Sequence, residues 1–130
     1  MRTEAMRRTK HMGEVISRLR FRRSPGDEPV TLELLVDTGS TYSWIDARDL
    51  KALGVRRARK RRFQTITGKR VTRDLGDLFI EYRGESAPTA VVFATPRDGQ
   101  VLGLHALESL GLAVDPASGR LRRSRFLLAM

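Results

Sequence analysis

The stretch LELLVDTGSTYSWI, residues 32–45, carries the strongest indication of the fold in this sequence. An apolar strand runs directly into an acid, a hydroxyl, a glycine and a second hydroxyl (Asp37, Thr38, Gly39 and Ser40), and the chain then becomes apolar again. Asp, Gly and Ser are common turn formers, so one interpretation is a strand that simply ends in a turn. The other interpretation is that the turn holds the Asp37 carboxylate where it can do chemistry.

The composition predicts a folded, soluble chain with few kinds of reactive side chain. At 130 residues, with 40% hydrophobic and 31% charged residues, it is typical of a small globular protein. No apolar run approaches the roughly 20 residues needed to cross a bilayer, and the basic N-terminal segment lacks the apolar stretch of a secretory signal. We therefore expect no membrane association and a cytoplasmic location. With no cysteine and two histidines, a disulfide framework, thiolate chemistry and a clustered His/Cys metal site are excluded.

The formal net charge of +10 raises the question of a polyanionic partner. Its densest part is the cluster at residues 56–62, within VRRARKRRF. The other basic residues are scattered along the chain and nearly all are arginine, which a compositional bias explains about as well as a binding surface does. The cluster is thus either a polyanion site or a solvated basic face, and nucleic acid is not the expected partner.

Alternation of apolar and polar residues predicts mainly β structure. A hairpin is expected from residues 14–23 and 30–36, which flank the turn segment SPGDEP. Residues 46–54 (DARDLKALG) are expected to form a helix, with Asp46 as its N-cap and Gly54 at its end. The other expected elements are a strand over 42–45, a hairpin around Thr67-Gly68, strands over 77–82 and 87–94, a helical stretch over 104–111, and short segments over 112–115 and 120–123.

Turn signals recur about every 8–12 residues, as is typical of a barrel or sandwich. The sequence predicts a flexible N-terminal arm over residues 1–11, one domain over residues 12–123 and a C-terminal tail over residues 124–130.

Two segments of the chain resemble the retropepsin-like aspartic peptidases. LLVDTGSTYSWI, residues 34–45, is similar to their active-site strand and turn. AVVFATPRDGQVLGLHALESLGLAVDP, residues 90–116, is similar to the apolar-apolar-Gly segment and helix that complete their fold. The resemblance spans residues 13–121 and is closest to small single-domain bacterial and archaeal members. It implies a mainly β, closed β-barrel-like acid protease (retropepsin) fold with one or two short helices.

The resemblance assigns a role to each residue of the turn. Asp37 would be the catalytic carboxylate, and Thr38 would bond to the backbone of a partner subunit. Gly39 would allow a backbone geometry forbidden to other residues and leave space for substrate. Ser40 would donate a hydrogen bond to the carboxylate and favour its ionised form.

The resemblance also predicts a flap and a substrate pocket. The flap would span residues 63–75, with Ile66, Thr67 and Gly68 at its tip. Leu102 and Gly103 would lie beneath the active site, where Leu102 either lines a substrate pocket or simply packs in the core. Trp44 is expected in the core, and His105 on the surface.

An aspartic peptidase needs two carboxylates that share one proton, since two like charges so close cannot both ionise. This chain has a single Asp-Thr-Gly, and Asp115, which precedes a proline, is better interpreted as structural. The resemblance therefore implies a homodimer with Asp37 of each subunit at the twofold axis, a peptide or protein substrate, and neither metal nor organic cofactor. The alternatives are a non-catalytic peptide-binding or dimerisation module of the same fold and a basic nucleic-acid-binding domain.

Overall fold

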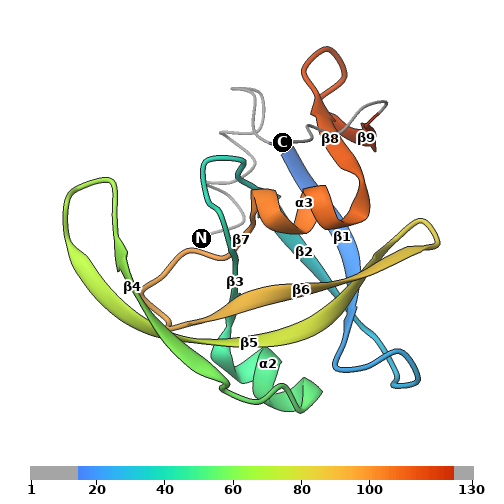
Figure 1. Cartoon of the computed structure of the whole chain (residues 1–130). Helices are drawn as coiled ribbons and strands as arrows, with labels where there is room; N and C mark the ends of the chain where they lie inside the picture. Colours follow the sequence, from blue (N-terminus) through green and yellow to red (C-terminus); the bar gives the residue numbers. More distant parts are fainter. Residues whose placement is uncertain (1–14, 125–130) are drawn as a thin grey trace, which may run out of the picture.

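The computed structural model describes residues 15–124, which form a mainly β structure with two short helices (Figure 1). The expected fold class is thereby confirmed. The expected N-terminal arm, and the tail beyond Ser124, lie outside the described residues.

The first two strands form the expected antiparallel hairpin. β1 spans Val15–Arg22 and β2 spans Val30–Val36. The residues of β1 that alternation predicts to be buried are indeed buried: Val15, Ser17, Leu19 and Phe21. β2 alternates less cleanly, because Leu34 is buried whereas Val30, beside the turn, is exposed.

A short strand and a capped helix follow. β3 spans Ser43–Asp46 and α2 spans Ala47–Leu53. The Asp46 carboxylate accepts a hydrogen bond of 2.8 Å from the backbone N–H of Arg48, and Gly54 ends the helix at φ 84°. Both caps are the expected ones, since an Asp side chain satisfies a free N–H at a helix start and glycine adopts the left-handed conformation at little cost.

A long hairpin then leads into the centre of the sheet. β4 spans Arg59–Gln64, β5 spans Arg70–Tyr82 and β6 spans Glu85–Ala94. The two strands expected on either side of Gly76 are a single strand of 13 residues, which pairs first with β4 and then with β6. A Cβ at Gly76 would lie 2.8 Å from the Val55 side chain, so this glycine permits close packing and does not interrupt the strand.

The last elements are short. β7 spans Val101–Leu102, α3 spans Leu104–Leu110, β8 spans Leu112–Asp115 and β9 spans Arg120–Arg123. β8 and β9 form a separate two-stranded sheet, which lies beside α3 and β1 at one end of the molecule (Figure 1).

Seven strands form one sheet in the order β1-β2-β7-β3-β6-β5-β4, and a further pairing of β1 with β5 closes the first six into a ring. β4 lies outside the ring, with β5 as its neighbour. Side chains from the ring, α2 and α3 form one core, which includes Ile45, Leu50 and Leu107. No helix within residues 15–124 is long and apolar enough to span a membrane.

Candidate active site

A parallel pairing of β2 with β7 brings the two motif segments together. Val36, at the end of β2, lies opposite Leu102, at the end of β7. The next residue, Asp37, donates its backbone N–H to the carbonyl of Leu102, with an N···O distance of 2.9 Å. The Asp-Thr-Gly turn and the downstream apolar-apolar-Gly segment therefore lie side by side.

The turn fixes both the backbone and the carboxylate of Asp37, which is exposed. Oδ1 of Asp37 accepts a hydrogen bond of 2.9 Å from Gly39 N–H, and the Asp37 carbonyl accepts one of 3.1 Å from Ser40 N–H. Gly39 does not have a positive φ, so the expected special backbone geometry is not what requires glycine here. A Cβ at this position would lie 3.2 Å from Asp37 Oδ1, and its absence leaves room beside the carboxylate.

The Ser40 hydroxyl has a different partner from the expected one. It donates a hydrogen bond of 2.7 Å to the carbonyl of Tyr42. Since a hydroxyl has one proton to donate, that proton is not available to the Asp37 carboxylate. In this structure the Ser40 hydroxyl closes the turn through the Tyr42 carbonyl.

The far side of the turn is fixed by Gly103 and the residues after it. Gly103 donates its N–H to the buried Ser43 hydroxyl at 2.9 Å, and Leu104 donates to the Ser40 carbonyl at 2.8 Å. A Cβ at Gly103 would lie 2.8 Å from the Ser40 carbonyl oxygen and closer still to that of Tyr42. Gly103 is therefore required because two backbone segments approach closely, and it lies beneath the turn as expected.

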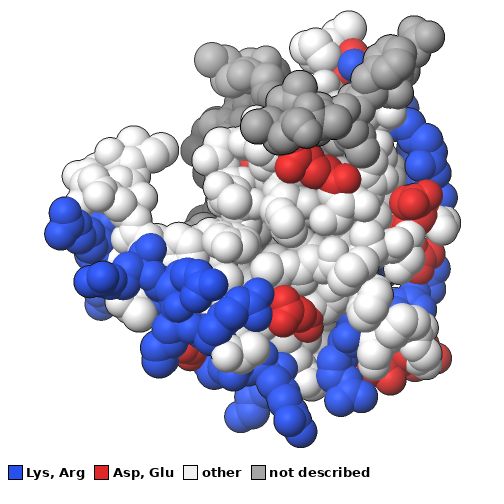
Figure 2. Space-filling view, viewed as in Figure 1, with Lys and Arg blue, Asp and Glu red and all other residues white. Residues whose placement is uncertain are grey.

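A cleft of about 810 Å³ opens beside the Asp37 carboxylate. This volume lies within the range of ligand-binding clefts. Its walls come from the turn, from the β4–β5 hairpin and from the loop before β7, and include Asp37, Gly39–Tyr42, Trp44, Phe63–Thr67, Val71, Arg97–Gly99 and Val101. The space-filling view shows the hairpin standing apart from the body of the molecule (Figure 2).

Leu102, Trp44 and His105 occupy different positions relative to the cleft. Leu102 is fully buried in the core and does not line this cleft. Of its two expected roles, core packing is therefore the one that agrees with its position. The cleft wall is formed at this point by the neighbouring Val101. Trp44, expected in the core, is half-buried and lines the cleft, whereas His105 is exposed as expected.

The β4–β5 hairpin is anchored at its stem and open at its tip. Phe63 packs edge-on against Trp44, with ring centroids 4.9 Å apart, and against Tyr42 at 6.1 Å. At the tip, Gly68 has a φ of 88° and donates its N–H to the Thr65 carbonyl at 2.9 Å. The side chain of Ile66 is fully exposed.

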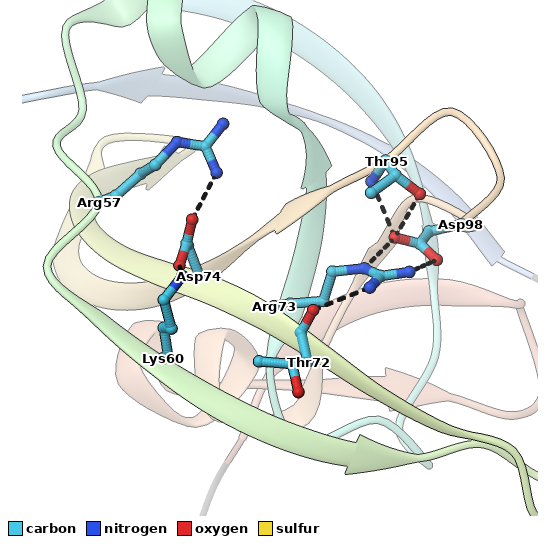
Figure 3. A network of polar contacts seen from close by, with 7 residues as sticks. All are labelled: Arg57, Lys60, Thr72, Arg73, Asp74, Thr95 and Asp98. Carbon is cyan, nitrogen blue, oxygen red and sulfur yellow. Dashed lines mark hydrogen bonds and ion pairs between the residues drawn. The ribbon is translucent and has the colours of Figure 1, made fainter.

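An ion pair ties the hairpin to the opposite wall (Figure 3). Arg73 of β5 donates two hydrogen bonds to the Asp98 carboxylate, of 2.8 and 3.0 Å. Asp98 also accepts bonds from the backbone N–H and the hydroxyl of Thr95. The pKa of Asp98 lies below its usual value, mainly because Arg73 donates hydrogen bonds to its carboxylate. Partial burial acts in the opposite direction and raises the pKa, whereas the hydrogen bonds from Thr95 lower it further.

Asp37 and Asp98 are the carboxylates that line the cleft within residues 15–124, and only Asp98 is ion-paired with a cation there. Asp115 lies in the β8–β9 hairpin, where it accepts a hydrogen bond of 3.0 Å from Ala117 N–H. The described part of the chain contains no group of three or more His, Cys, Asp or Glu side chains that could hold a metal ion.

Four residues help to build this site, and three of them carry no recognisable signal in the sequence. Ser43 holds Gly103, Phe63 anchors the hairpin, and Arg73 with Asp98 connects the two walls. Each depends on a neighbour far along the chain. A signal exists only for Asp98, because Thr-Pro-Arg-Asp-Gly is a typical turn sequence in which Asp bonds its own backbone.

Comparison with known proteins supports the interpretation of the two segments. A search of curated proteins found no match. A family model described as aspartyl protease matches residues 25–106, which include the Asp-Thr-Gly turn, the hairpin, both β2 and β7, and Gly103. This match covers more than half of the chain, so the chain belongs to the retropepsin-like aspartyl protease family.

Proposed function

We propose that the protein is an aspartic endopeptidase in which Asp37 from each of two subunits forms the catalytic dyad. One carboxylate acts as base towards an attacking water, and the other, protonated, donates to the carbonyl oxygen of the scissile peptide bond. The observation that carries the proposal is the position of Asp37, exposed beside an 810 Å³ cleft and held there by the Gly39 N–H and the Leu102 carbonyl.

The single carboxylate is the reason for proposing two subunits. Asp98, the other acid along the cleft, is held ionised by Arg73 and cannot share a proton at moderate pH. Thr38 supports the same arrangement, since its side chain is exposed and makes no hydrogen bond to the rest of residues 15–124. In a twofold dimer the Thr38 hydroxyl bonds to the partner's turn and holds the two carboxylates in place.

The β4–β5 hairpin supports a flap role. Ile66, Thr67 and Gly68 form its tip, and the first two line the cleft. An exposed apolar tip above a cleft can close over an extended peptide, exclude water and present backbone groups to the substrate. The cleft wall at Val101 and Trp44 then provides the apolar surface for substrate side chains.

Loss of cleavage on Asp37→Asn tests the proposal. The wild-type chain should cleave members of a diverse peptide library under acidic to neutral conditions and give a bell-shaped pH profile with dyad pKa values. Asp37→Asn should fold and dimerise normally but cleave nothing. A wild-type dimer that binds peptides and cleaves none would identify the chain as a non-catalytic binding module of this fold.

A further inference from the structure

The hairpin carries more cations than its carboxylates neutralise. Residues 56–73 contain nine arginines and lysines. Four of them are ion-paired: Arg57 and Lys60 with Asp74, Arg59 with Asp77, and Arg73 with Asp98. The other five, Arg56, Arg61, Arg62, Lys69 and Arg70, are exposed and form no ion pair with the described residues.

The uncompensated charge lies toward the tip of the hairpin. On the outward face Lys60 lies opposite Asp74 and is paired with it. Two residues closer to the tip Arg62 lies opposite Thr72, and beyond it Arg70 lies opposite Gln64. We call Arg61, Arg62, Lys69 and Arg70 the tip cations. Figure 2 shows the basic residues as a nearly continuous band along the hairpin.

This arrangement costs stability. Arg62 and Arg70 are diagonal neighbours on one face of the hairpin, and like charges so placed repel each other. Cations on an edge strand can protect it from pairing with other chains, which would explain Arg61 and Arg62 on β4. Near the tip β5 pairs with β4 alone, so Lys69 and Arg70 also border an unpaired strand edge, and edge protection applies to them as well.

The tip cations flank the residues that line the cleft. Thr65, Ile66 and Thr67 line it and lie between Arg62 and Lys69 in the sequence. On the other wall, Arg97 lines the cleft, is exposed and forms no ion pair within residues 15–124. A chain that extends out of the cleft therefore meets positive charge from both walls.

We propose that the tip cations bind an acidic segment of the substrate that lies outside the residues held in the cleft. This inference rests on the proposed peptidase function and names its substrate class. Side chains on one side of an extended peptide recur about every 6.6–7 Å. This repeat is close to the roughly 7–8 Å that separates diagonal neighbours on a hairpin, such as Arg62 and Arg70. Alternating Asp or Glu side chains thus match the spacing of the surface.

A peptide fits this surface better than a nucleic acid does. Proteins that bind single strands combine cations with exposed aromatic rings on which bases stack. Phe63, the one aromatic residue of the hairpin stem between Arg59 and Thr72, is turned inward against Trp44 and Tyr42. The outward face offers charge without a stacking platform.

Binding to full-length Asp37→Asn tests the inference without relying on turnover. The probes are a fluorescent peptide rich in Glu, a peptide with each Glu replaced by Gln, and a single-stranded oligonucleotide of equal charge. The Glu peptide should bind most tightly, and its affinity should fall with added salt because exposed charges are screened. In Arg62→Gln/Lys69→Gln/Arg70→Gln its affinity should fall about tenfold.

The matched control removes three exposed, unpaired cations from the other end of the molecule. Arg83→Gln/Arg120→Gln/Arg122→Gln has the same net charge as the tip variant and should change the affinity less than about twofold. Equal losses in both triple variants, equal binding of the two peptides, or tighter binding of the oligonucleotide would each overturn the inference. Cleavage of a neutral peptide by the wild-type chain reports separately on the proposed function.

Discussion

Gly103 packs directly against the carbonyl group of Tyr42, at a distance that leaves no space for a Cβ. Together with the hydrogen bond from Leu104 N–H to the Ser40 carbonyl, this contact fixes the end of the turn that begins at Asp37. The downstream segment thus acts as the support on which the candidate catalytic turn is built.

Gly103→Ala should destabilise the protein by more than about 2 kcal/mol, because the new methyl group would meet two backbone carbonyls that cannot move independently. Urea unfolding followed by circular dichroism measures the change. Gly99→Ala, where a Cβ would meet nothing within 4 Å, is the matched control and should stay within about 0.5 kcal/mol of the wild type. Equal effects of the two substitutions would show that the close approach at Gly103 is not the reason for glycine.

Ser40→Ala should reduce stability and leave the pH profile of cleavage unchanged. Its hydroxyl donates to the Tyr42 carbonyl, so its removal costs about 1 kcal/mol of turn stability. A shift in the acidic limb of the pH profile without loss of stability would contradict this role. It would instead indicate that the hydroxyl donates to the Asp37 carboxylate in the assembled dimer.

Phe63→Ala should loosen the hairpin at its stem. Trp44 is the one tryptophan of the chain, so its fluorescence reports the contact directly. Its emission should shift to longer wavelength as water reaches the indole, and the amides of β4 should exchange hydrogen faster. Phe63→Leu, which keeps an apolar contact, should show a smaller shift. Unchanged emission in Phe63→Ala would place the anchor of the hairpin elsewhere.

The Arg73–Asp98 pair should stabilise the protein at neutral pH and lose its effect in acid. A double-mutant cycle with Arg73→Gln and Asp98→Asn should give a coupling of about 1–2 kcal/mol at pH 7, since both side chains are largely buried. The pKa of Asp98 is lowered in the folded protein from its ordinary value of 3.8. The ion pair therefore contributes fully to stability above pH 3.8, and this contribution is lost as the pH falls through the folded-state pKa. A coupling that stays constant as the pH is lowered until the protein unfolds would contradict this reasoning.

Local sequence signals predicted the parts of the fold that depend on neighbouring residues. The helix between Asp46 and Gly54 follows from its two caps, and the β1–β2 hairpin follows from alternation around a turn. Sequence patterns divide the long β5 strand at Gly76, with one expected strand before it and one after it. Its glycine is needed for packing against Val55, which no local pattern reveals.

The site itself was predictable only in part. The motif identified Asp37 and Gly103, but the distribution of side chains around the cleft depends on parallel pairings between distant strands. Val101 and Leu102 differ by one residue, yet one lines the cleft and the other lies in the core. Likewise, the sequence does not show which acceptor the Ser40 hydroxyl binds, and the structure places it on the Tyr42 carbonyl.

We expect activity to require Asp37 from both subunits, a claim that subunit mixing tests. Wild-type and Asp37→Asn chains are combined in equal amounts, exchanged to equilibrium at a concentration where the dimer is saturated, and assayed against wild type at the same total concentration. A shared dyad leaves activity only in the wild-type homodimers, which is about a quarter of the wild-type rate for random pairing. Retention of about half of the rate would contradict the claim, because each subunit would then act with its own Asp37 alone.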